Sequence, residues 1–352
     1  MTTPDTPRPE VAVVVGAFGR ETFLPRAVRS VLGQTLPRDR VEVVVLTDFA
    51  DGRLEASLAA EGVTSLQYAE PRIGRWLLRA VGVTHAPLIA FLDDDDEWES
   101  ERLARAVEVF REHPEVGFYR NRVRVIDRDG VPVPAEGWRR LESDAAFDAS
   151  GPILVPPGPK AGLAELAAVR TRVTFNSSTM VVRRELLEGP WADAFARTQL
   201  PDLALFLSAA LGPYGLFLDD RRLTRFRRYD GNVTRRTAWL AEAARSYREG
   251  RDLARAHGRP DIASWLGDSS VQYEREYRAA QLFERIGARA PRREVARLAA
   301  SYLRFYLEHP AGRGALVEVG TTELYSLAYC LAPALARRFR TGRAGVPASG
   351  AS

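Results

Sequence analysis

Short apolar runs alternate with stretches of helical periodicity in the N-terminal part of the chain. Residues 11–15, 41–46 and 88–92 (VAVVV, VEVVVL and LIAFL) are almost continuously apolar, a pattern typical of strands that are covered on both faces. Residues 24–32 and 73–81 instead carry apolar side chains at helical spacing. Strands that alternate with helices predict a mostly parallel, doubly wound sheet with right-handed connections.

The pattern is less regular after these elements. Residues 115–127 alternate enough between apolar and polar positions to predict a strand, and the pair Asp129 and Gly130 predicts a hairpin turn after it. Residues 132–169 are rich in proline, glycine and alanine. We expect this segment to be an insertion or lid.

Helical periodicity dominates the C-terminal part of the chain, from residue 237 to about residue 340. We therefore expect two domains, an α/β domain at residues 1–235 and an α-helical region with a basic tail at residues 236–352. The apolar stretch at residues 324–336 precedes a cluster of arginines and is shorter than the roughly 18 residues that a membrane span needs. A buried terminal helix or peripheral contact with an anionic membrane surface would both fit it.

Composition removes several classes of protein. The formal net charge is only +4, and Lys160 is the only lysine, so almost all positively charged residues are arginines. Since the sequence also contains no recognisable nucleic-acid-binding module, a nucleic-acid-binding protein is not expected. Cys330 is the only cysteine, which excludes a disulfide or cysteine metal site within one chain. The first ten residues are polar and predict no export signal. We expect a cytoplasmic protein, with the inner membrane face as the place of any peripheral contact.

Four consecutive aspartates, from Asp93 to Asp96, follow the third apolar run. In an open α/β sheet, ligands bind beyond the carboxyl ends of the strands, and carboxylate oxygens suit a divalent cation. Apolar side chains recur at helical spacing from Trp98 onward, so Asp95 or Asp96 is expected at the start of a helix. An N-cap in a solvated turn is the alternative interpretation of the run.

Three predicted strand ends, which carry Phe18, Asp48 and the aspartate run, are expected to lie side by side and form a nucleotide-sized crevice. The first turn, GAFG at residues 16–19, lacks the G-x-G-x-x-G spacing of a dinucleotide-binding domain. The chain also has no Gly-Lys-Ser or Gly-Lys-Thr sequence of a Walker loop. Phosphates must then be bound by other means, and a metal ion on carboxylates is the most available.

These features resemble glycosyltransferase family 2. The opening VAVVVGAFGR resembles that family's first strand followed by Pro-Thr-Tyr-Asn-Arg, and LPRAVRSVLGQT resembles its first helix with a Ser-x-x-x-Gln-Thr pattern. VEVVVLTDFADG resembles the second strand with its Asp-Asp-Gly-Ser turn, and IAFLDDDDEW resembles the metal-binding D-x-D motif. The resemblance implies an α/β fold of GT-A type, with a Rossmann-like, mostly parallel sheet flanked by helices and followed by a helical C-terminal region.

The resemblance also implies where a nucleotide-sugar donor binds. Phe18 takes the place of the aromatic residue that packs against the base, and Asp48 that of the acid that hydrogen-bonds it. Arg75 and Arg79 correspond to basic residues near the phosphates, with a solvated helix face as the alternative. The implied donor-binding set is Ala17, Phe18, Arg20, Asp48, Arg75, Arg79, Asp93 and Asp94.

The metal and the catalytic base are implied in the same way. Asp95, assisted by Asp93, corresponds to the residues that hold Mn²⁺ or Mg²⁺ on the diphosphate. Asp202 in LPDLALFL corresponds to the catalytic acid residue at a helix start, although Pro201 stands where a second acid is usual. An acid favoured by the helix dipole is the alternative for Asp202.

One further departure concerns the loop near residue 229. Tyr229 occupies the position of a histidine in the family's closing motif. We expect that the neighbouring arginines could supply positive charge to the phosphates instead; they are Arg225, Arg227 and Arg228.

The function implied is inverting, metal-assisted transfer of a hexose-type sugar from a nucleotide diphosphate sugar, with UDP favoured, to an acceptor hydroxyl. The acceptor class stays open between a saccharide, a lipid-linked glycan and a small molecule. Two alternatives also stay open, a sugar-phosphate nucleotidyltransferase and a non-catalytic nucleotide-sugar-binding protein. The helical region would support the acceptor side or form a homo-oligomer interface.

Overall fold

The structure is a computed structural model that describes residues 8–18, 22–133, 151–157, 173–229 and 237–309. The chain divides into two compact units. The first unit comprises Met1–Asn232 with Ser246–Leu266, and the second comprises Val233–Arg245 with Gly267–Ser352. The boundary predicted between residues 235 and 236 stays a prediction, and helix α9 (Thr237–Ala256) contributes residues to both units.

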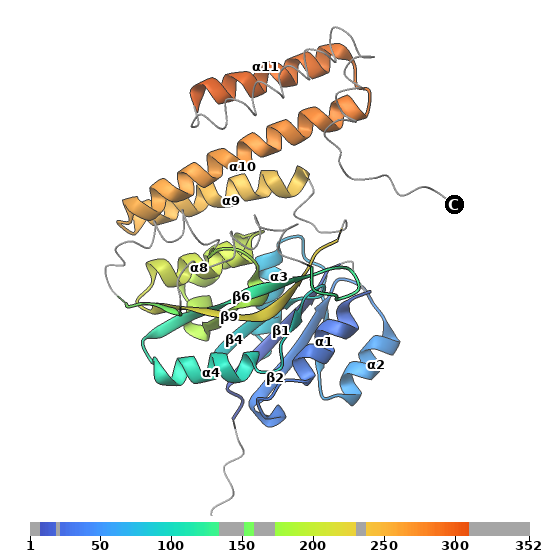
Figure 1. The fold of residues 1–352 in the computed structure, drawn as a ribbon, viewed down its shortest axis with the longest axis vertical. Helices are drawn as coiled ribbons and strands as arrows, with labels where there is room; N and C mark the ends of the chain where they lie inside the picture. Colours follow the sequence, from blue (N-terminus) through green and yellow to red (C-terminus); the bar gives the residue numbers. More distant parts are fainter. Residues whose placement is uncertain (1–7, 19–21, 134–150, 158–172, 230–236, 310–352) are drawn as a thin grey trace, which may run out of the picture. The chain divides into compact units, whose positions relative to one another are not determined.

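A nine-stranded sheet forms the centre of the first unit (Figure 1). Its main order is β3-β2-β1-β4-β8-β6-β9-β5, and β7 pairs with β9. The strands are β1 (Val11–Ala17), β2 (Val41–Thr47), β3 (Thr64–Gln67), β4 (Leu88–Asp93), β5 (Glu97–Trp98), β6 (Val116–Ile126), β7 (Ile153–Val155), β8 (Met180–Arg183) and β9 (Gly215–Arg227).

The sheet is parallel in its N-terminal half and mixed as a whole. Strands β3, β2, β1 and β4 run parallel to one another, as the apolar runs predict. β8 pairs antiparallel with both β4 and β6, while β6 and β9 are parallel. The α/β class is confirmed, with a mixed sheet and helices that flank it.

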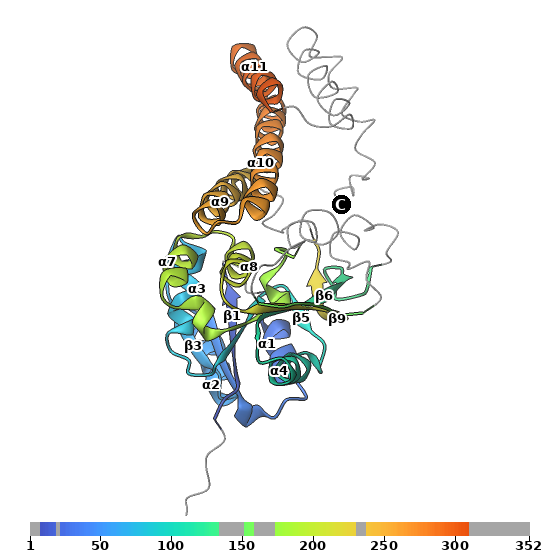
Figure 2. The ribbon, with the colours of Figure 1, turned by 90° about the vertical axis from the view of Figure 1, so that its left-hand side faces the viewer.

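Helices cover both faces of this sheet (Figure 2). One face packs against α1 and α4, and the other packs against α3, α7 and α8. Successive residues of a strand point to opposite faces, so a single strand contributes side chains to both layers. Ala90 and Leu92 of β4 belong to the core formed with α1 and α4, whereas Phe91 stacks on Phe195 of α7. The helices are α1 (Leu24–Leu32), α2 (Gly52–Ala60), α3 (Ile73–Val81), α4 (Arg102–Glu112), α7 (Pro190–Arg197) and α8 (Pro201–Leu211), with short 3₁₀ turns η1 (Arg38–Arg40), η4 (Ser177–Thr179) and η5 (Arg184–Leu187).

Helices α3 and α7 approach one another closely at Gly74. A Cβ atom built on Gly74 would lie 1.7 Å from the backbone oxygen of Phe195. The main-chain N–H of Gly74 also donates a 3.1 Å hydrogen bond to the carbonyl of Thr198. Only glycine fits this contact, since any side chain would overlap a backbone atom.

The helix expected directly after the aspartate run does not begin there. Glu97 and Trp98 form β5, which pairs with Arg225 and Thr224 of β9, and α4 begins only at Arg102. Trp98 is buried and donates from Nε1 to the carbonyl of Ser178 at 2.8 Å. The prediction that Asp95 or Asp96 starts a helix is therefore wrong, because pairing with β9 keeps the chain extended after the turn.

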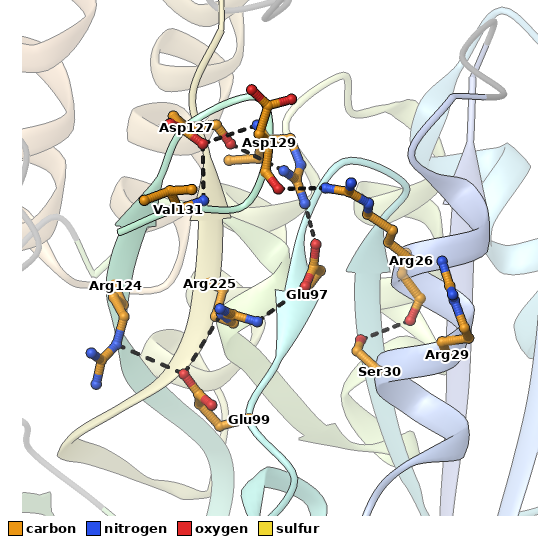
Figure 3. A network of polar contacts seen from close by, with 12 residues as sticks. Arg26, Arg29, Ser30, Glu97, Glu99, Arg124, Asp127, Asp129, Val131 and Arg225 are labelled. Atoms are coloured by element: carbon orange, nitrogen blue, oxygen red, sulfur yellow. Dashed lines mark hydrogen bonds and ion pairs between the residues drawn. The ribbon is translucent and has the colours of Figure 1, made fainter. Parts of the chain in front are cut away.

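The turn at Asp129 and Gly130 is confirmed. Asp127 accepts hydrogen bonds from the main-chain N–H groups of Asp129 and Val131 (Figure 3), and Ile126 bridges to Pro132. Within the predicted insertion at residues 132–169, the described residues include strand β7. Most of that segment lies outside the described residues.

The C-terminal helices are α9, α10 (Pro260–Gly287) and α11 (Arg292–Glu308), which confirms the predicted helical region. In the second unit, Leu282, Ile286 and Val295 form a small apolar cluster. No helix among the described residues is both long and apolar enough to cross a membrane. The apolar stretch at residues 324–336 and the arginines after it lie outside the described residues.

Candidate active site

The carboxyl ends of β2, β1 and β4 lie next to one another. Ala17 is in register with Thr47, and Gly16 is in register with Asp93. The predicted crevice edge is thus formed by neighbouring parallel strands. Gly16 is needed here, because a Cβ on it would lie 2.9 Å from the Trp76 ring.

The opening turn places an aromatic surface at this edge. The Phe18 side chain is 48% exposed and meets Trp76 edge-on, with 5.9 Å between ring centroids. An exposed ring at the end of a strand is able to stack on a nucleotide base. Ala17 is fully buried and belongs to the core, and Arg20 lies outside the described residues.

Asp48 is half-buried directly after β2. A cavity of about 230 Å³ adjoins this strand end and is lined by Thr47, Asp51, Gln67 and neighbouring residues of α2 and β3. Asp51 is occupied as the N-cap of α2, since it accepts from the N–H groups of Arg53 and Leu54. Asp48 follows Thr47 in the chain but is not one of the residues that line this cavity, and its predicted role at the base stays a prediction.

Three carboxylates of the aspartate run converge. One oxygen each of Asp93, Asp95 and Asp96 lies within 4.8 Å of the others. Asp93 is partly exposed at the end of β4, while Asp95 and Asp96 are buried. The predicted pair Asp95 and Asp93 is brought together, and Asp96 joins it as a third carboxylate that the sequence interpretation did not single out.

Each buried carboxylate of this cluster also has protein partners. Tyr229 donates its hydroxyl to Oδ2 of Asp95 at 3.2 Å. Asp96 accepts from the main-chain N–H of Arg227 at 3.0 Å and from Nδ2 of Asn176 at 2.8 Å. These bonds orient the carboxylates of Asp95 and Asp96.

The cluster is suited to a divalent cation on electrostatic grounds. Burial raises the pKa of Asp96 well above its ordinary value, and the negative charges of Asp95 and Asp93 raise it further. A bound cation would offset that repulsion, and an all-oxygen donor set fits Mg²⁺ or Mn²⁺. Asp94, placed in the donor-binding set from the sequence, is fully buried, and its predicted role stays a prediction.

Asp202 lies in the first turn of α8, as predicted, and is partly buried. Its Oδ1 accepts from the N–H of Leu203 at 2.9 Å, and its Oδ2 accepts from the N–H of Asn176 at 3.1 Å. Burial raises the pKa of Asp202 to about 7, and the negative charge of Asp93 contributes to the increase. A carboxylate with a pKa near neutrality is well matched to accepting a proton.

The two arginines of α3 are exposed. Arg75 forms a 3.6 Å ion pair with Glu70, and the guanidinium of Arg79 lies over the Tyr68 ring, 5.7 Å from its centroid. These contacts fit the alternative of a solvated helix face. Their predicted role near the phosphates stays a prediction.

The arginines of β9 act largely within the fold. Arg227 is completely buried; its Nε donates to the carbonyl of Asp95 at 2.9 Å, and its other nitrogens bind Glu97 and the carbonyls of Asp127 and Arg128. It is not available to phosphates, and that hypothesis is wrong for Arg227. Arg225 pairs with Glu97 at 3.2 Å (Figure 3).

A second cavity, of about 500 Å³, lies beside this polar network. It is lined by residues of α1, β5 and the turn after β6 and by Arg225. Figure 3 shows Arg26 reaching from α1 to the carbonyl of Asp129, a 2.7 Å hydrogen bond. The cluster of Asp93, Asp95 and Asp96 does not line it.

Sequence reasoning missed the residues that connect the aspartates to the rest of the site. Asn176, Ser177 and Ser178, to which the sequence pattern assigns no role, all contact the aspartate run. The signal that could have found them is the run of small polar residues directly before the apolar residues of β8. Tyr229 was noted only as a departure from a histidine.

Comparison with known proteins agrees with this arrangement. Residues 12–168 match the family described as "Glycosyl transferase family 2". An uncharacterized glycosyltransferase of Nostoc sp. (strain PCC 7120) is 29% identical over 119 residues, which are 31% of this chain and 35% of that relative. The matched region thus spans about a third of that curated relative.

Solved structures of similar fold cover nearly the whole chain. The crystal structure of S. aureus TarS 1-349 has a TM-score of 0.53 at 15% identity, over 95% of this chain and 92% of that one. A structure of the same TarS fragment in complex with UDP-GlcNAc has a TM-score of 0.53 at 16% identity, with the same coverage. At this level of identity the likeness shows the fold.

Proposed function

The chain carries a glycosyltransferase family 2 domain, and from this premise we propose that it transfers a sugar from a nucleotide diphosphate sugar to an acceptor hydroxyl with inversion at the anomeric carbon. The observation that carries the proposal is the convergence of Asp93, Asp95 and Asp96 at the carboxyl edge of the parallel strands. Asn176 connects this cluster to the proposed base, because it hydrogen-bonds both Asp96 and Asp202. A UDP-sugar is the donor proposed first, following the UDP-GlcNAc bound by TarS.

The donor is proposed to lie across the strand ends. Phe18 offers an exposed ring to the base, and Asp48 offers a carboxylate to its polar edge. Asp93, Asp95 and Asp96 would hold Mn²⁺ or Mg²⁺, which supplies positive charge to the diphosphate as it leaves. Tyr229 and Asn176 orient two of these carboxylates through the hydrogen bonds described above.

Asp202 is proposed as the general base. Its carboxylate accepts the proton of the acceptor hydroxyl while the oxygen attacks the anomeric carbon opposite the leaving diphosphate. The raised pKa supports this role, because a carboxylate of ordinary pKa would be a weaker base. The bonds from Leu203 and Asn176 keep the carboxylate oriented.

Calorimetric binding of UDP, dTDP and GDP tests the donor site. Each nucleotide is titrated with Mn²⁺ and again with chelator, on the wild type, Asp95→Ala and Asp39→Ala. Asp39 is an exposed aspartate in η1 and serves as a matched control. We expect metal-dependent binding of one nucleotide that Asp95→Ala loses and Asp39→Ala keeps; binding of none would contradict the proposal.

Product analysis tests the reaction. A glycosyltransferase releases nucleoside diphosphate from the donor, whereas a sugar-phosphate nucleotidyltransferase releases diphosphate from a triphosphate. Asp202→Asn should keep nucleotide binding and lose turnover. Nucleotide-sugar binding without transfer or hydrolysis over a broad acceptor set would instead favour a non-catalytic binding protein.

A further inference from the structure

Asn176 has an unusual backbone conformation. Its φ is 64° and its ψ is 102°, and among the described residues only Asn176 and Arg289 have a positive φ without being glycine. Such a conformation costs free energy and persists only where surrounding contacts fix it. Asn176 is also buried, with 7% of its surface exposed.

Every polar group of Asn176 is hydrogen-bonded. Its main-chain N–H donates to Oδ2 of Asp202 at 3.1 Å, and its Nδ2 donates to Oδ2 of Asp96 at 2.8 Å. Its Oδ1 accepts from the N–H of Ser178 at 2.7 Å, which caps the 3₁₀ turn η4. Its carbonyl accepts from both the N–H and the hydroxyl of Thr179.

The two residues that follow also contact the aspartate run. The hydroxyl of Ser178 accepts from the N–H of Asp93 at 3.0 Å, and the hydroxyl of Ser177 lies 3.4 Å from Oδ1 of Asp93. The segment from Asn176 to Ser178 is therefore tied to the acidic turn at three places. Asn176 alone of the three is also bonded to Asp202.

We infer that Asn176 is a positioning residue that fixes the catalytic base relative to the metal-binding carboxylates, an inference that rests on the proposed function. In-line displacement needs the base on one side of the anomeric carbon and the leaving diphosphate on the other. One residue that donates to Asp202 from its main chain and to Asp96 from its side chain sets the separation of these two groups. The positive φ aims the N–H and the side chain at the two carboxylates.

Asn176→Gly tests the contribution of the side chain while preserving the backbone conformation. Glycine adopts a positive φ readily and retains the N–H that reaches Asp202, but it removes the bonds to Asp96 and Ser178. Arg289→Gly is the matched control, because Arg289 is an exposed residue with a φ of 56° in the second unit. Asn176→Asp is the second variant; it keeps the size and the acceptor for Ser178 and replaces the donor to Asp96 by an oxygen.

The experiment measures two quantities on each variant after thermal unfolding has shown that it is folded. One is the calorimetric affinity for UDP in the presence of Mn²⁺, and the other is kcat for sugar transfer. We expect Asn176→Gly and Asn176→Asp to lose about 10- to 100-fold in both quantities, the usual range when a group that orients metal ligands is removed. Arg289→Gly should change neither by more than about twofold, as expected of a substitution at an exposed residue that does not belong to the unit carrying the site.

A double-mutant cycle identifies the route of the kcat effect. If Asn176 acts through Asp202, Asn176→Gly will lower the residual kcat much less in the Asp202→Asn background than in the wild type. Full additivity would overturn the inference, as would a loss confined to either kcat or Mn²⁺-dependent UDP affinity. A wild type that neither binds nucleotide nor transfers sugar would instead overturn the proposed function, and the inference with it.

Discussion

At the scale of single residues, Asp202 combines two opposing influences. Two main-chain N–H groups favour its charged form, but burial and the charge of Asp93 outweigh them and raise its pKa to about 7. The resemblance to glycosyltransferase family 2 implied the role of Asp202, which stays a prediction. The run of small polar residues before β8 could have drawn attention to Asn176, but its bond to Asp96 joins residues far apart in sequence, and its positive φ has no sequence signature other than asparagine itself.

The pH dependence of transfer follows from this pKa. A general base must be deprotonated, so a raised pKa leaves Asp202 partly protonated at neutral pH and kcat should fall as the pH decreases through about 7. Transfer rates of the wild type measured from pH 5 to pH 9 should show this inflection, and the low residual rate of Asp202→Asn should not. A rate that stays level down to pH 5 would contradict the assignment.

Tyr229→Phe tests the hydrogen bond to Asp95. The substitution removes the hydroxyl 3.2 Å from Oδ2 of Asp95 but keeps the ring that packs edge-on against Phe23. We expect Mn²⁺-dependent UDP affinity to fall about tenfold, since the carboxylate loses an orienting donor. Tyr277→Phe, which removes a hydroxyl bonded to Gln281 on α10, is the control and should leave the calorimetric affinity unchanged.

At the scale of elements, the hydrophobic pattern of the sequence predicted the helices and strands that are encoded within short stretches of chain. Residues 73–81 match α3, and the three apolar runs form β1, β2 and β4. The spacing of apolar residues and the length of each run can be seen directly in the sequence. β5 and β7 could not be predicted in this way. Each is only two or three residues long and exists through pairing with β9, which lies far along the chain.

The contact between α3 and α7 gives a prediction for stability. Gly74→Ala places a Cβ against the backbone oxygen of Phe195, so the two helices must separate. We expect the free energy of unfolding to fall by about 2–3 kcal/mol in urea titrations. Gly52→Ala, at the exposed first residue of α2 with no atom within 4 Å of the new Cβ, should be neutral or stabilising; equal effects of the two would disprove the close contact.

At the scale of the whole molecule, the acidic cluster, the aromatic turn and Asp202 all belong to the first unit. The sequence predicted an α/β part followed by helices, yet not that residues 246–266 would join the first unit. Tyr247 bonds Thr174 through its hydroxyl at 2.8 Å, and Trp265 packs edge-on against Phe206 of α8. The sequence shows that these helices have an apolar face, but it does not indicate which surface of the protein packs against that face.

Because the aspartate cluster belongs to the first unit, metal binding should stabilise that unit selectively. Mn²⁺ at 100 times its dissociation constant adds about 2.7 kcal/mol to the state that binds it. Hydrogen exchange followed by mass spectrometry should show slower exchange in β4, β8 and α8, and unchanged exchange in α11. Asp95→Ala should abolish the difference, and protection that extends equally to α11 would contradict a site confined to the first unit.

The position of β8 has a consequence for synthesis on the ribosome. β4 pairs with β1 on one side and with β8 on the other, but Met180 is translated long after Asp93. At about 5–20 residues per second, the nascent chain carries β4 for several seconds with an unpaired edge. Such an edge is a template for pairing with other chains, so we expect the yield of this protein to depend on chaperones that bind nascent chains during that interval.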